Sequence, residues 1–413
     1  MSRWSSFRFR SDDSRPTSPR RRVPRLTRGL LLSLSFAFAL CLPFSRALAE
    51  PPSRAHPQDG KMIFRFDTFG DEQLWTDTLQ LNTVIETAVS PRVALGVGLK
   101  VDSEALPEDF LAGRNLDDPA TTVELIRLNA VVGVVGRVDD GHLKSVGITC
   151  AICHSTVDNS VTAGIGRRLD GWPNRDLNPG AIIALSPVLT AKQKAVYNSW
   201  GPGKFDPRFN VDGINGPVVI PPAFGLKGVG FETFTGDGPI SYWNNYVAVV
   251  EMGGHGSFYD PRIGISITQT PDLVTPKLPA LLDYQLSLPT PPPPPGSFDP
   301  AAAGRGRALF MSKANCASCH MPPHYTDVLR GPDRSTPFLH DPSAVGTDPG
   351  YAERSATGQY RTTPLRALWQ HPPYFHDGSA PNLLAVVDHY DQFFGLRLSA
   401  REKADLVEFL KSL

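Results

Sequence analysis

The sequence Cys-x-x-Cys-His occurs twice in this chain of 413 residues. In this motif two thiols form thioether bonds to a haem, and the adjacent histidine binds the haem iron. The two copies therefore predict two covalently bound haem c groups. The residues that would hold them are Cys150, Cys153, His154, Cys316, Cys319 and His320.

Other uses of paired cysteines fit the sequence less well. The two pairs together could supply four thiolates, as structural zinc sites do. Each pair alone has the spacing of a redox dithiol or a small disulfide. Neither use explains why a histidine follows both pairs at the same place. The N-terminal segment predicts that the chain is exported, and a zinc site made of thiolates is not expected in an exported protein.

The N-terminal segment 1–49 has the organisation of a secretory signal peptide. An arginine-rich start is followed by an apolar run at 29–44 and by an Ala-Leu-Ala sequence that ends at Ala49. We expect cleavage after Ala49. The apolar run is shorter than the roughly 20 residues of a membrane-spanning helix, so no stable membrane anchor is expected. The mature protein should be periplasmic or otherwise exported, where haem attachment takes place.

Charge and cysteine content narrow the classes of partner. The chain has 41 basic and 41 acidic residues, and segment 1–49 contains ten arginines and two acidic residues. Removing that segment leaves a net charge of about −8. No basic stripe remains, so nucleic acid is not expected as a partner. Cys41 leaves with the segment, and the other four cysteines all belong to the two motifs, so no disulfide is expected.

Composition also divides the remaining chain. Residues 50–62 are proline-rich and polar, and we expect them to be disordered. Five consecutive prolines begin at Pro291, and such runs form semi-rigid spacers. We therefore predict a first haem domain at 63–288, a proline-rich linker at 289–296 and a second haem domain at 297–413.

Several helices are expected before and after the first motif. Apolar residues at helical spacing predict an amphipathic helix over 71–85. Asp118 followed by Pro119 predicts a capped helix start, and apolar spacing continues to about Val138. From 154 to 239 the chain is dense in Gly, Pro, Asn and Asp, which predicts loops with short helices.

Two helices are expected in the last third of the chain. Asp299 and Pro300 begin one that should reach about Lys313, just before the second motif. Ser399 and Glu402 form a capping box that begins a closing helix. This arrangement resembles the class I cytochrome c fold, in which the first and last helices cross. We therefore expect a mainly α protein made of two class I cytochrome c-like haem domains with long irregular loops.

Two further sequences strengthen and extend this resemblance. Thr-Pro-Leu-Arg at 363–366 and Pro-Tyr-Phe-His-Asp-Gly at 373–378 resemble the bacterial di-haem cytochrome c peroxidases and the related MauG-type enzymes. The resemblance implies that the N-terminal haem reacts with peroxide and that the C-terminal haem accepts electrons from a donor. It also implies an acid near the N-terminal haem that helps to cleave the O–O bond. Glu251 resembles that catalytic acid.

The second axial ligand of each iron remains open between neighbouring candidates. For the first haem these are Met252 and His255, and the alternative is a sixth site that is open or filled by water. For the second haem they are His389 and Tyr390; the resemblance to MauG-type enzymes favours Tyr390, and imidazole chemistry favours His389. Since no methionine follows Met321, the usual downstream methionine ligand is missing. Side chains that are adjacent on a helix point about 100° apart, so only one of the pair should face the iron.

The sequence therefore predicts an exported di-haem c-type cytochrome with peroxidase-type or oxidase-type redox chemistry. The expected partners are peroxide or oxygen as substrate and a small redox protein or electron-transport component as donor. The main alternative is a non-enzymatic electron carrier, and a haem-based sensor ranks third. A polar tract at 206–215 also suggests Ca²⁺, although its spacing is not that of an EF-hand.

Overall fold

The described chain begins with a helix inside the segment that we expected to be disordered. The computed structural model describes residues 57–333 and 335–413, so the predicted signal peptide lies outside the described residues. Helix α1 (Pro57–Phe66) packs against helix α10 (Leu278–Ser287). Phe64 is fully buried there, with its ring 5.6 Å from that of Tyr284. The prediction of disorder is therefore wrong for residues 57–62, because apolar burial outweighs their polar composition.

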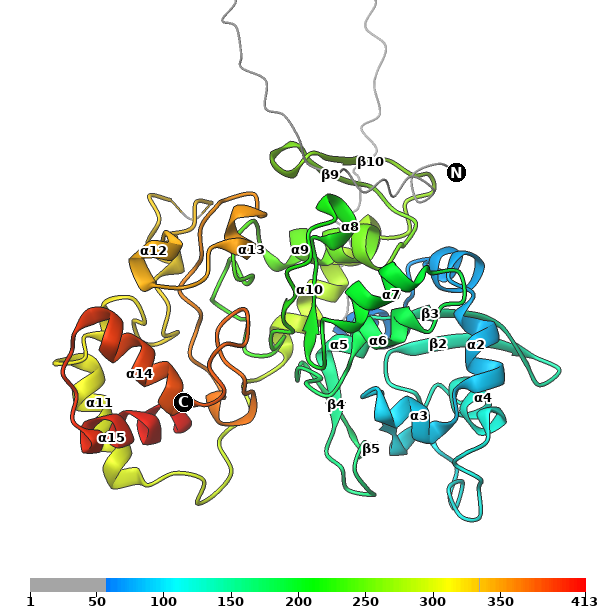
Figure 1. The fold of residues 1–413 in the computed structure, drawn as a ribbon, viewed down its shortest axis with the longest axis horizontal. Coiled ribbons are helices and arrows are strands. Elements are labelled where there is room, and N and C mark those ends of the chain that lie inside the picture. The colour runs from blue at the N-terminus through cyan, green and yellow to red at the C-terminus, as the bar shows by residue number, and fades with distance from the viewer. Residues whose placement is uncertain (1–56, 334) are drawn as a thin grey trace, which may run out of the picture. The chain divides into compact units, whose positions relative to one another are not determined.

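Most of the other helices are short, and the three longest, α11 (Pro300–Met311), α14 (Leu383–Phe394) and α15 (Ala400–Lys411), lie after the proline run (Figure 1). Before it lie α2 (Leu81–Ala88), α3 (Pro91–Gly96), α4 (Pro119–Arg127), α5 (Ala151–His154), α6 (Pro179–Ala184), α7 (Ala191–Asn198), α8 (Phe209–Asp212) and α9 (Ile240–Tyr246). After it also lie α12 (Pro342–Val345) and α13 (Gly350–Glu353).

Strands in the described residues form five two-stranded sheets, so the fold is mixed rather than mainly α as expected. One pair is parallel, β1 (Val101–Asp102) with β5 (Ile165–Gly166). The antiparallel pairs are β2 (Val134–Asp139) with β3 (His142–Ile148), β4 (Ser155–Val157) with β6 (Arg168–Asp170), β7 (Lys204–Phe205) with β8 (Val218–Val219), and β9 (Phe258–Asp260) with β10 (Ile265–Ile267).

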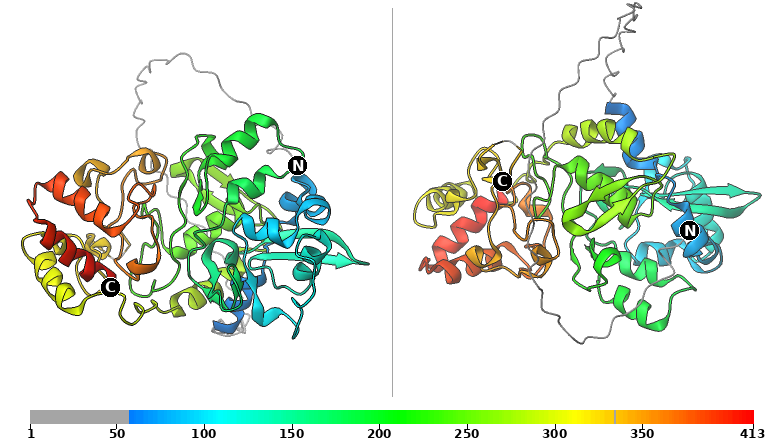
Figure 2. Two further views of the ribbon diagram at one scale, coloured as in Figure 1. Left: turned by 60° about the horizontal axis from the view of Figure 1, so that its bottom comes forward. Right: turned by 90° about the horizontal axis from the view of Figure 1, so that it is seen from above.

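The β2–β3 hairpin replaces the second half of a helix that we predicted to reach Val138. Asp118 caps α4 as expected, since its carboxylate accepts from the backbone N–H of Ala120 at 2.9 Å. The helix nevertheless ends at Arg127, and Asn129 turns the chain with a φ of 55°. The β-branched residues that follow pair across the hairpin, which projects beside the neighbouring helices (Figure 2).

The helix predicted over 71–85 is also interrupted. A π-helical turn covers Gln73–Thr78, and α2 starts only at Leu81. Gln80 lies between them in the left-handed region, with a φ of 55°. The predicted face is nevertheless buried at Leu74 and Leu81, so the periodicity identified the buried face and missed the break.

The two helices predicted for the last third of the chain are confirmed. Asp299 caps α11, and Ser399 with Glu402 forms the capping box of α15. The helices α11 and α15 pack together at Gly306, where an added Cβ would lie 2.0 Å from the carbonyl oxygen of Asp405. Helix α14 packs against α15 and completes this group (Figure 1).

The hydrophobic cores follow the division that the proline run suggested. Two clusters of buried apolar side chains are built from residues 64–284, and a third is built from residues 310–410. A small fourth cluster joins Val218 to Tyr351, Ala352 and Tyr360. The two cytochrome c-like domains and the linker boundary stay predictions. Among the described residues, no helix has the length and apolar character needed to cross a membrane.

Candidate functional site

The second motif opens on a large apolar cavity of about 560 Å³. Cys316, Cys319 and His320 form part of its wall, together with side chains of α14 and α15. Most of the other lining residues are aliphatic or aromatic. Cofactor pockets in proteins typically measure about 300–1,000 Å³ and are mainly apolar. The cavity therefore has the size and the lining that a haem attached to these two cysteines requires.

Each motif histidine is oriented by a backbone carbonyl. Nδ1 of His154 lies 3.1 Å from the carbonyl oxygen of Pro221, and Nδ1 of His320 lies 3.0 Å from that of Tyr325. A carbonyl can only accept, so Nδ1 carries the hydrogen and Nε2 is free to bind a metal. Burial lowers the pKa of both rings, that of His154 to about 4, so both are neutral near pH 7.

Three arginines in the second cavity fit the carboxylates of a haem. Arg175, Arg361 and Arg366 line the cavity. Nε and Nη1 of both Arg175 and Arg361 are buried without a hydrogen-bond partner in the described part of the chain. Burial lowers the pKa of each of these two guanidinium groups to about 10, so both remain charged. Haem c carries two propionates, and buried guanidinium groups with unused donors are suited to bind them.

The structure separates the two ligand candidates on α14. Tyr390 lines the cavity beside the second motif, and burial raises its pKa to about 12. His389, one position earlier, instead places Nε2 3.1 Å from the carbonyl oxygen of Val345. His376 also lines the cavity, with Nε2 3.0 Å from the hydroxyl of Tyr360. Tyr390 therefore has better access than His389 to a group bound in the cavity.

The first motif is enclosed more tightly. Cys150 follows β3, and burial raises the pKa of Cys150 and Cys153 to about 12. Of the ligand candidates for this site, Met252 is buried, and its carbonyl accepts from Nε1 of Trp75 at 2.9 Å. His255 is half-buried, and its backbone N–H donates to the carbonyl of Phe69 at 2.8 Å. The choice between Met252 and His255 stays open.

Glu251 lies at the end of a π-helical turn, Val247–Glu251, and is only 5% exposed. Its Oε2 accepts from Nδ2 of Asn210 at 3.2 Å. Its Oε1 is buried and has no hydrogen-bond partner among the described residues. Burial raises the pKa of Glu251 well above its usual range. Thus Oε2 of Glu251 is hydrogen-bonded, whereas Oε1 has no partner among the described residues.

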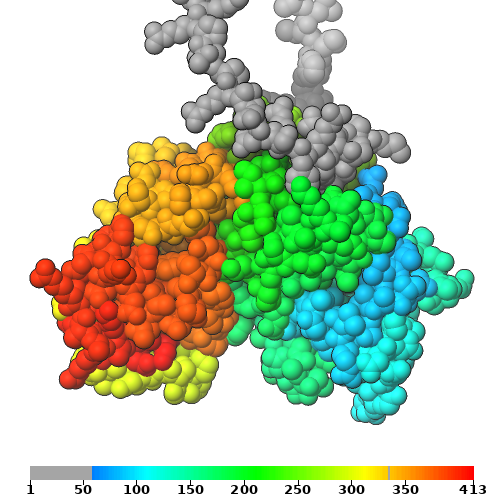
Figure 3. Space-filling view, viewed as in Figure 1, coloured from blue at the N-terminus to red at the C-terminus, as the bar shows by residue number. Residues whose placement is uncertain are grey.

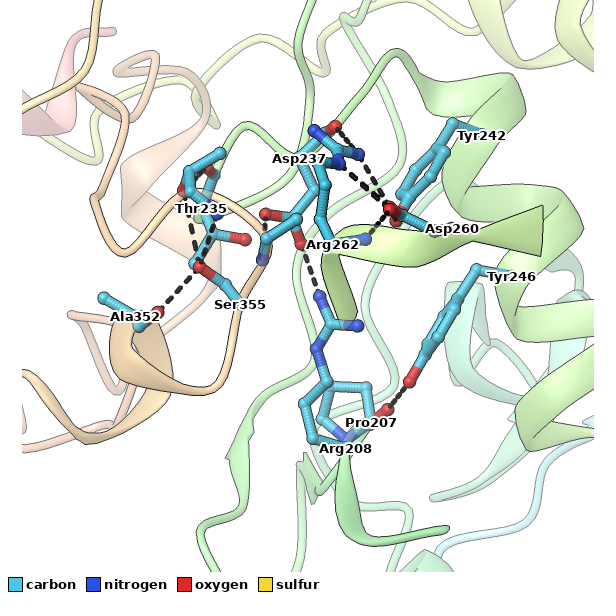
Figure 4. Close-up of polar contacts among 12 residues, drawn as sticks. Pro207, Arg208, Thr235, Asp237, Tyr242, Tyr246, Asp260, Arg262, Ala352 and Ser355 are labelled. Carbon is cyan, nitrogen blue, oxygen red and sulfur yellow. Dashed lines mark hydrogen bonds and ion pairs between the residues drawn. The ribbon is translucent and has the colours of Figure 1, made fainter. Parts of the chain in front are cut away.

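A buried ion pair near Glu251 was not foreseen from the sequence. Arg208 pairs with Asp237, and both side chains are almost fully buried (Figure 4). The guanidinium of Arg208 also lies 4.9 Å from the ring centre of Tyr246. The hydroxyl of Tyr246 donates to the carbonyl of Pro207 at 2.5 Å. Because 29 residues separate the ion-pair partners, no local sequence pattern could have indicated the pair.

Cys319, Asp327 and His340 form the one group in the described residues whose ligand atoms lie close enough together for a metal ion, within 4.8 Å of one another. Nε2 of His340 is 3.0 Å from Oδ2 of Asp327. Attachment of a haem to Cys319 would remove the thiol from this set. Once the thioether has formed, the group therefore lacks its thiol ligand and does not argue against a haem at this motif.

Neutral, carbonyl-anchored histidines beside paired cysteines are features of c-type haem proteins. Sequence comparison relates the chain to MauG and to cytochrome c peroxidases. It is 36% identical to methylamine utilization protein MauG of Methylorubrum extorquens over 131 residues, which are 27% of this chain and 35% of that protein. It is 32% identical to cytochrome-c peroxidase IdrP1 of Pseudomonas sp. (strain SCT) over 148 residues, which are 26% of this chain and 39% of that protein.

These similarities are partial. The matched stretch spans little more than a third of the length of these relatives, and no family model matches the chain. Two solved structures are each weakly similar to this chain in overall fold. A Kuenenia stuttgartiensis hydrazine synthase aligns over 48% of this chain and 73% of its own, at 22% identity and a TM-score of 0.30. A MauG-like protein associated with microbial copper homeostasis aligns over 33% and 56%, at 22% identity and a TM-score of 0.26.

Proposed function

We propose that this chain is an exported di-haem c-type cytochrome that carries out redox chemistry of the peroxidase or MauG kind. Peroxide or oxygen is its substrate, and a small redox protein or electron-transport component supplies electrons. Sequence similarity to MauG and to cytochrome c peroxidases supports haem-based redox chemistry. The two motifs and the signal-peptide pattern of 1–49 support the haem number and the export.

The observation that carries the enzymatic proposal is the buried, half-paired carboxyl of Glu251. A structural carboxyl at this depth normally has all its oxygens paired, because an unpaired buried polar atom costs free energy. Asn210 holds Oε2, and Oε1 is left free. A bound haem supplies iron that exchanges electrons and binds peroxide or oxygen. Glu251 would hold a proton at Oε1 and transfer it to or from the substrate.

In the second site, the geometry offers two candidate ligands to the iron of a bound haem. His320 would bind the iron through Nε2, since its Nδ1 is anchored by Tyr325. Tyr390 is our candidate for the opposite face, because it lines the cavity while His389 is engaged by Val345. A tyrosine oxygen stabilises an oxidised iron more than a methionine sulfur does, since methionine ligation raises the potential.

The test is peroxide reduction by Glu251→Gln, which keeps the shape of the side chain and removes its acid. We expect turnover to fall by roughly 10²-fold, as for loss of a general acid–base group. Glu124→Gln is the matched control, because Glu124 lies on the surface and pairs with Arg127 at 2.6 Å. Both variants must retain two haems per chain after denaturation and acid-acetone extraction.

Unchanged turnover in Glu251→Gln would remove this residue from the mechanism. A wild-type protein that contains both haems and reduces no peroxide with several donors would refute the peroxidase proposal, and the electron carrier would then be the better reading.

A further inference from the structure

One arginine near the end of α13 is surrounded by oxygen atoms of a loop from the other half of the chain. The loop consists of residues 206–216 and includes α8. Its oxygens come from the carboxylates of Asp206 and Asp212 and from the carbonyls of Ile214 and Gly216. All four residues accept hydrogen bonds from Arg354. The segment near residue 350 abuts the loop in the space-filling view (Figure 3).

All three nitrogens of the Arg354 guanidinium are used in this contact. Nε donates to Oδ2 of Asp212 at 2.7 Å. Nη1 donates to Oδ2 of Asp206 at 3.2 Å and to the carbonyl of Gly216 at 3.3 Å. Nη2 donates to Oδ1 of Asp206 at 2.9 Å, to Oδ1 of Asp212 at 3.0 Å and to the carbonyl of Ile214 at 2.8 Å. Six oxygens thus converge on one cation.

The loop is shaped around this cation. The side chain of Asp206 is fully buried, and that of Arg354 is only 8% exposed. Oδ2 of Asp206 also accepts from the backbone N–H of Gly216 at 2.6 Å, which closes the loop. A Cβ at Gly216 would lie 2.5 Å from Nη1 of Arg354. A side chain at position 216 would therefore push the guanidinium out of its present place.

The oxygens around Arg354 are those that Ca²⁺ prefers. Calcium binds six to eight oxygens from carboxylates and backbone carbonyls. The 206–216 loop offers two carboxylates and two carbonyls, and it is the tract whose composition suggested Ca²⁺. A planar guanidinium can satisfy two carboxylates at once through its forked donors.

We propose that Arg354 is the built-in cation of the 206–216 loop, so that the native loop needs no Ca²⁺ and removal of the arginine side chain turns the loop into a Ca²⁺ site. The same contact joins the segment after the proline run to the segment before it.

The contact also bears on Glu251, and this second step rests on the proposed function. Asn210, which donates to Glu251, lies in the 206–216 loop. Arg208 of the same loop pairs with Asp237, which accepts from the backbone N–H of Ala356 at 3.1 Å. Two residues close to Glu251 are therefore fixed by the segment that carries Arg354. Arg354 is a positioning residue for Asn210 and, through it, for Glu251.

The experiment compares the haem-loaded full chain with its Arg354→Ala variant by thermal unfolding, with EDTA, Ca²⁺ or guanidinium at millimolar concentration. The wild-type melting temperature should be the same with Ca²⁺ and with EDTA. The variant should melt roughly 5 °C lower in EDTA, because the buried carboxylate of Asp206 and the partly exposed carboxylate of Asp212 lose their partner. Ca²⁺ should restore most of this loss in a saturable manner, and titration calorimetry should find one Ca²⁺ per chain. Guanidinium ion should restore part of it.

Arg262→Ala is the matched control. Arg262 also pairs with a carboxylate, that of Asp260 at 2.7 Å, and donates to a carbonyl, that of Asp237 at 2.9 Å (Figure 4). It lacks the second carboxylate, so its removal should create no Ca²⁺ site. Adding Asp212→Asn to Arg354→Ala should abolish the Ca²⁺ effect.

A second variant keeps the proposal testable if Arg354→Ala does not fold. Arg354→Lys retains the charge, so its melting temperature should lie between those of the wild type and of Arg354→Ala, and it should bind no Ca²⁺. Calcium binding by the wild type that Asp212→Asn abolishes would overturn the proposal. So would an Arg354→Ala variant that neither binds Ca²⁺ nor is restored by guanidinium, or an Arg354→Lys variant that binds Ca²⁺. Peroxide turnover separates the two steps: if the variant gains a Ca²⁺ site and keeps wild-type kcat and KM, only the link to Glu251 fails.

Discussion

Single residues in this protein show that burial can remove the usual charge of a side chain. Asp71 is fully buried, and its carboxyl accepts from the backbone N–H of Ile148 at 3.1 Å. Burial raises the pKa of Asp71 to about 9. A Cβ at Gly147 would lie 2.3 Å from Oδ1 of Asp71, so the hairpin leaves room for this side chain only because residue 147 is a glycine. Asp71 is therefore neutral near pH 7.

This charge state predicts a pH-dependent stability that Asp71→Asn removes. The folded-state pKa of Asp71, about 9, lies above its ordinary value of 3.8, so between these values the native state binds the extra proton. The free energy of unfolding of the wild type should therefore fall as pH rises through this window. The free energy of unfolding should fall more steeply with pH in the wild type than in Asp71→Asn, by about 1 kcal/mol per pH unit. Urea unfolding of both proteins at pH 5, 6, 7 and 8 measures it, and parallel curves would contradict it.

At the same scale, the sequence predicts which kinds of residue the sites contain better than it predicts where those residues lie in the fold. The two Cys-x-x-Cys-His motifs predict both histidine ligands, because five adjacent residues contain the whole signal. The choice between His389 and Tyr390 was not available from sequence, since it depends on how far α14 is rotated about its axis. Arg354 was missed for another reason: its partners Asp206 and Asp212 lie more than 140 residues away, and only the folded chain brings them together.

Among the elements, helix starts were easier to predict than helix ends. The caps at Asp118, Asp299 and Ser399 are confirmed, because a cap is a hydrogen bond to the next two or three residues. The end of α4 was predicted about ten residues too late. The apolar spacing continued beyond Arg127, but a positive φ at Asn129 diverted those residues into a hairpin. Apolar spacing alone did not distinguish the two outcomes.

The contact between α11 and α15 gives a prediction at this scale. Gly306→Ala should destabilise the protein by roughly 2 kcal/mol or more, because the new Cβ would overlap the backbone of Asp405. The gain in helix propensity, about 1 kcal/mol, is too small to compensate. Gly304→Ala is the control in the same helix: a Cβ there meets nothing within 4 Å, so this variant should be more stable than the wild type. Thermal unfolding of the two variants decides, and equal stabilisation by both would contradict the close contact.

For the whole molecule, the proline run divides the cores but does not isolate the two parts of the chain. The large apolar clusters lie on one side of the run or the other. The contacts across the division include polar ones, Arg354 with Asp206 and Ala356 with Asp237, and one small apolar cluster around Val218. Apolar patterning can predict the cores, because it is read along one element. It cannot predict polar contacts between distant loops, which depend on how the folded parts meet.

The ligand set of the second haem is a property of the whole chain, because it depends on every methionine that could reach the iron. Met311 and Met321, the methionines nearest the second motif, are 52% and 37% exposed, and neither lines the cavity that contains His320 and Tyr390. We therefore expect no methionine ligand on this haem and a potential below that of a His/Met cytochrome.

The visible spectrum of the oxidised full chain tests this ligand set. A sulfur-to-iron charge-transfer band at the red edge should be absent or, if Met252 binds the first haem, should vanish in Met252→Leu. A band that survives in Met252→Leu would show that another methionine has reached an iron. Tyr390→Phe should change the spectrum of the second haem, and Tyr390→Met should create the missing band, since position 390 faces the cavity. The corresponding changes at His389 should leave the spectrum as it is, because that ring is directed to Val345.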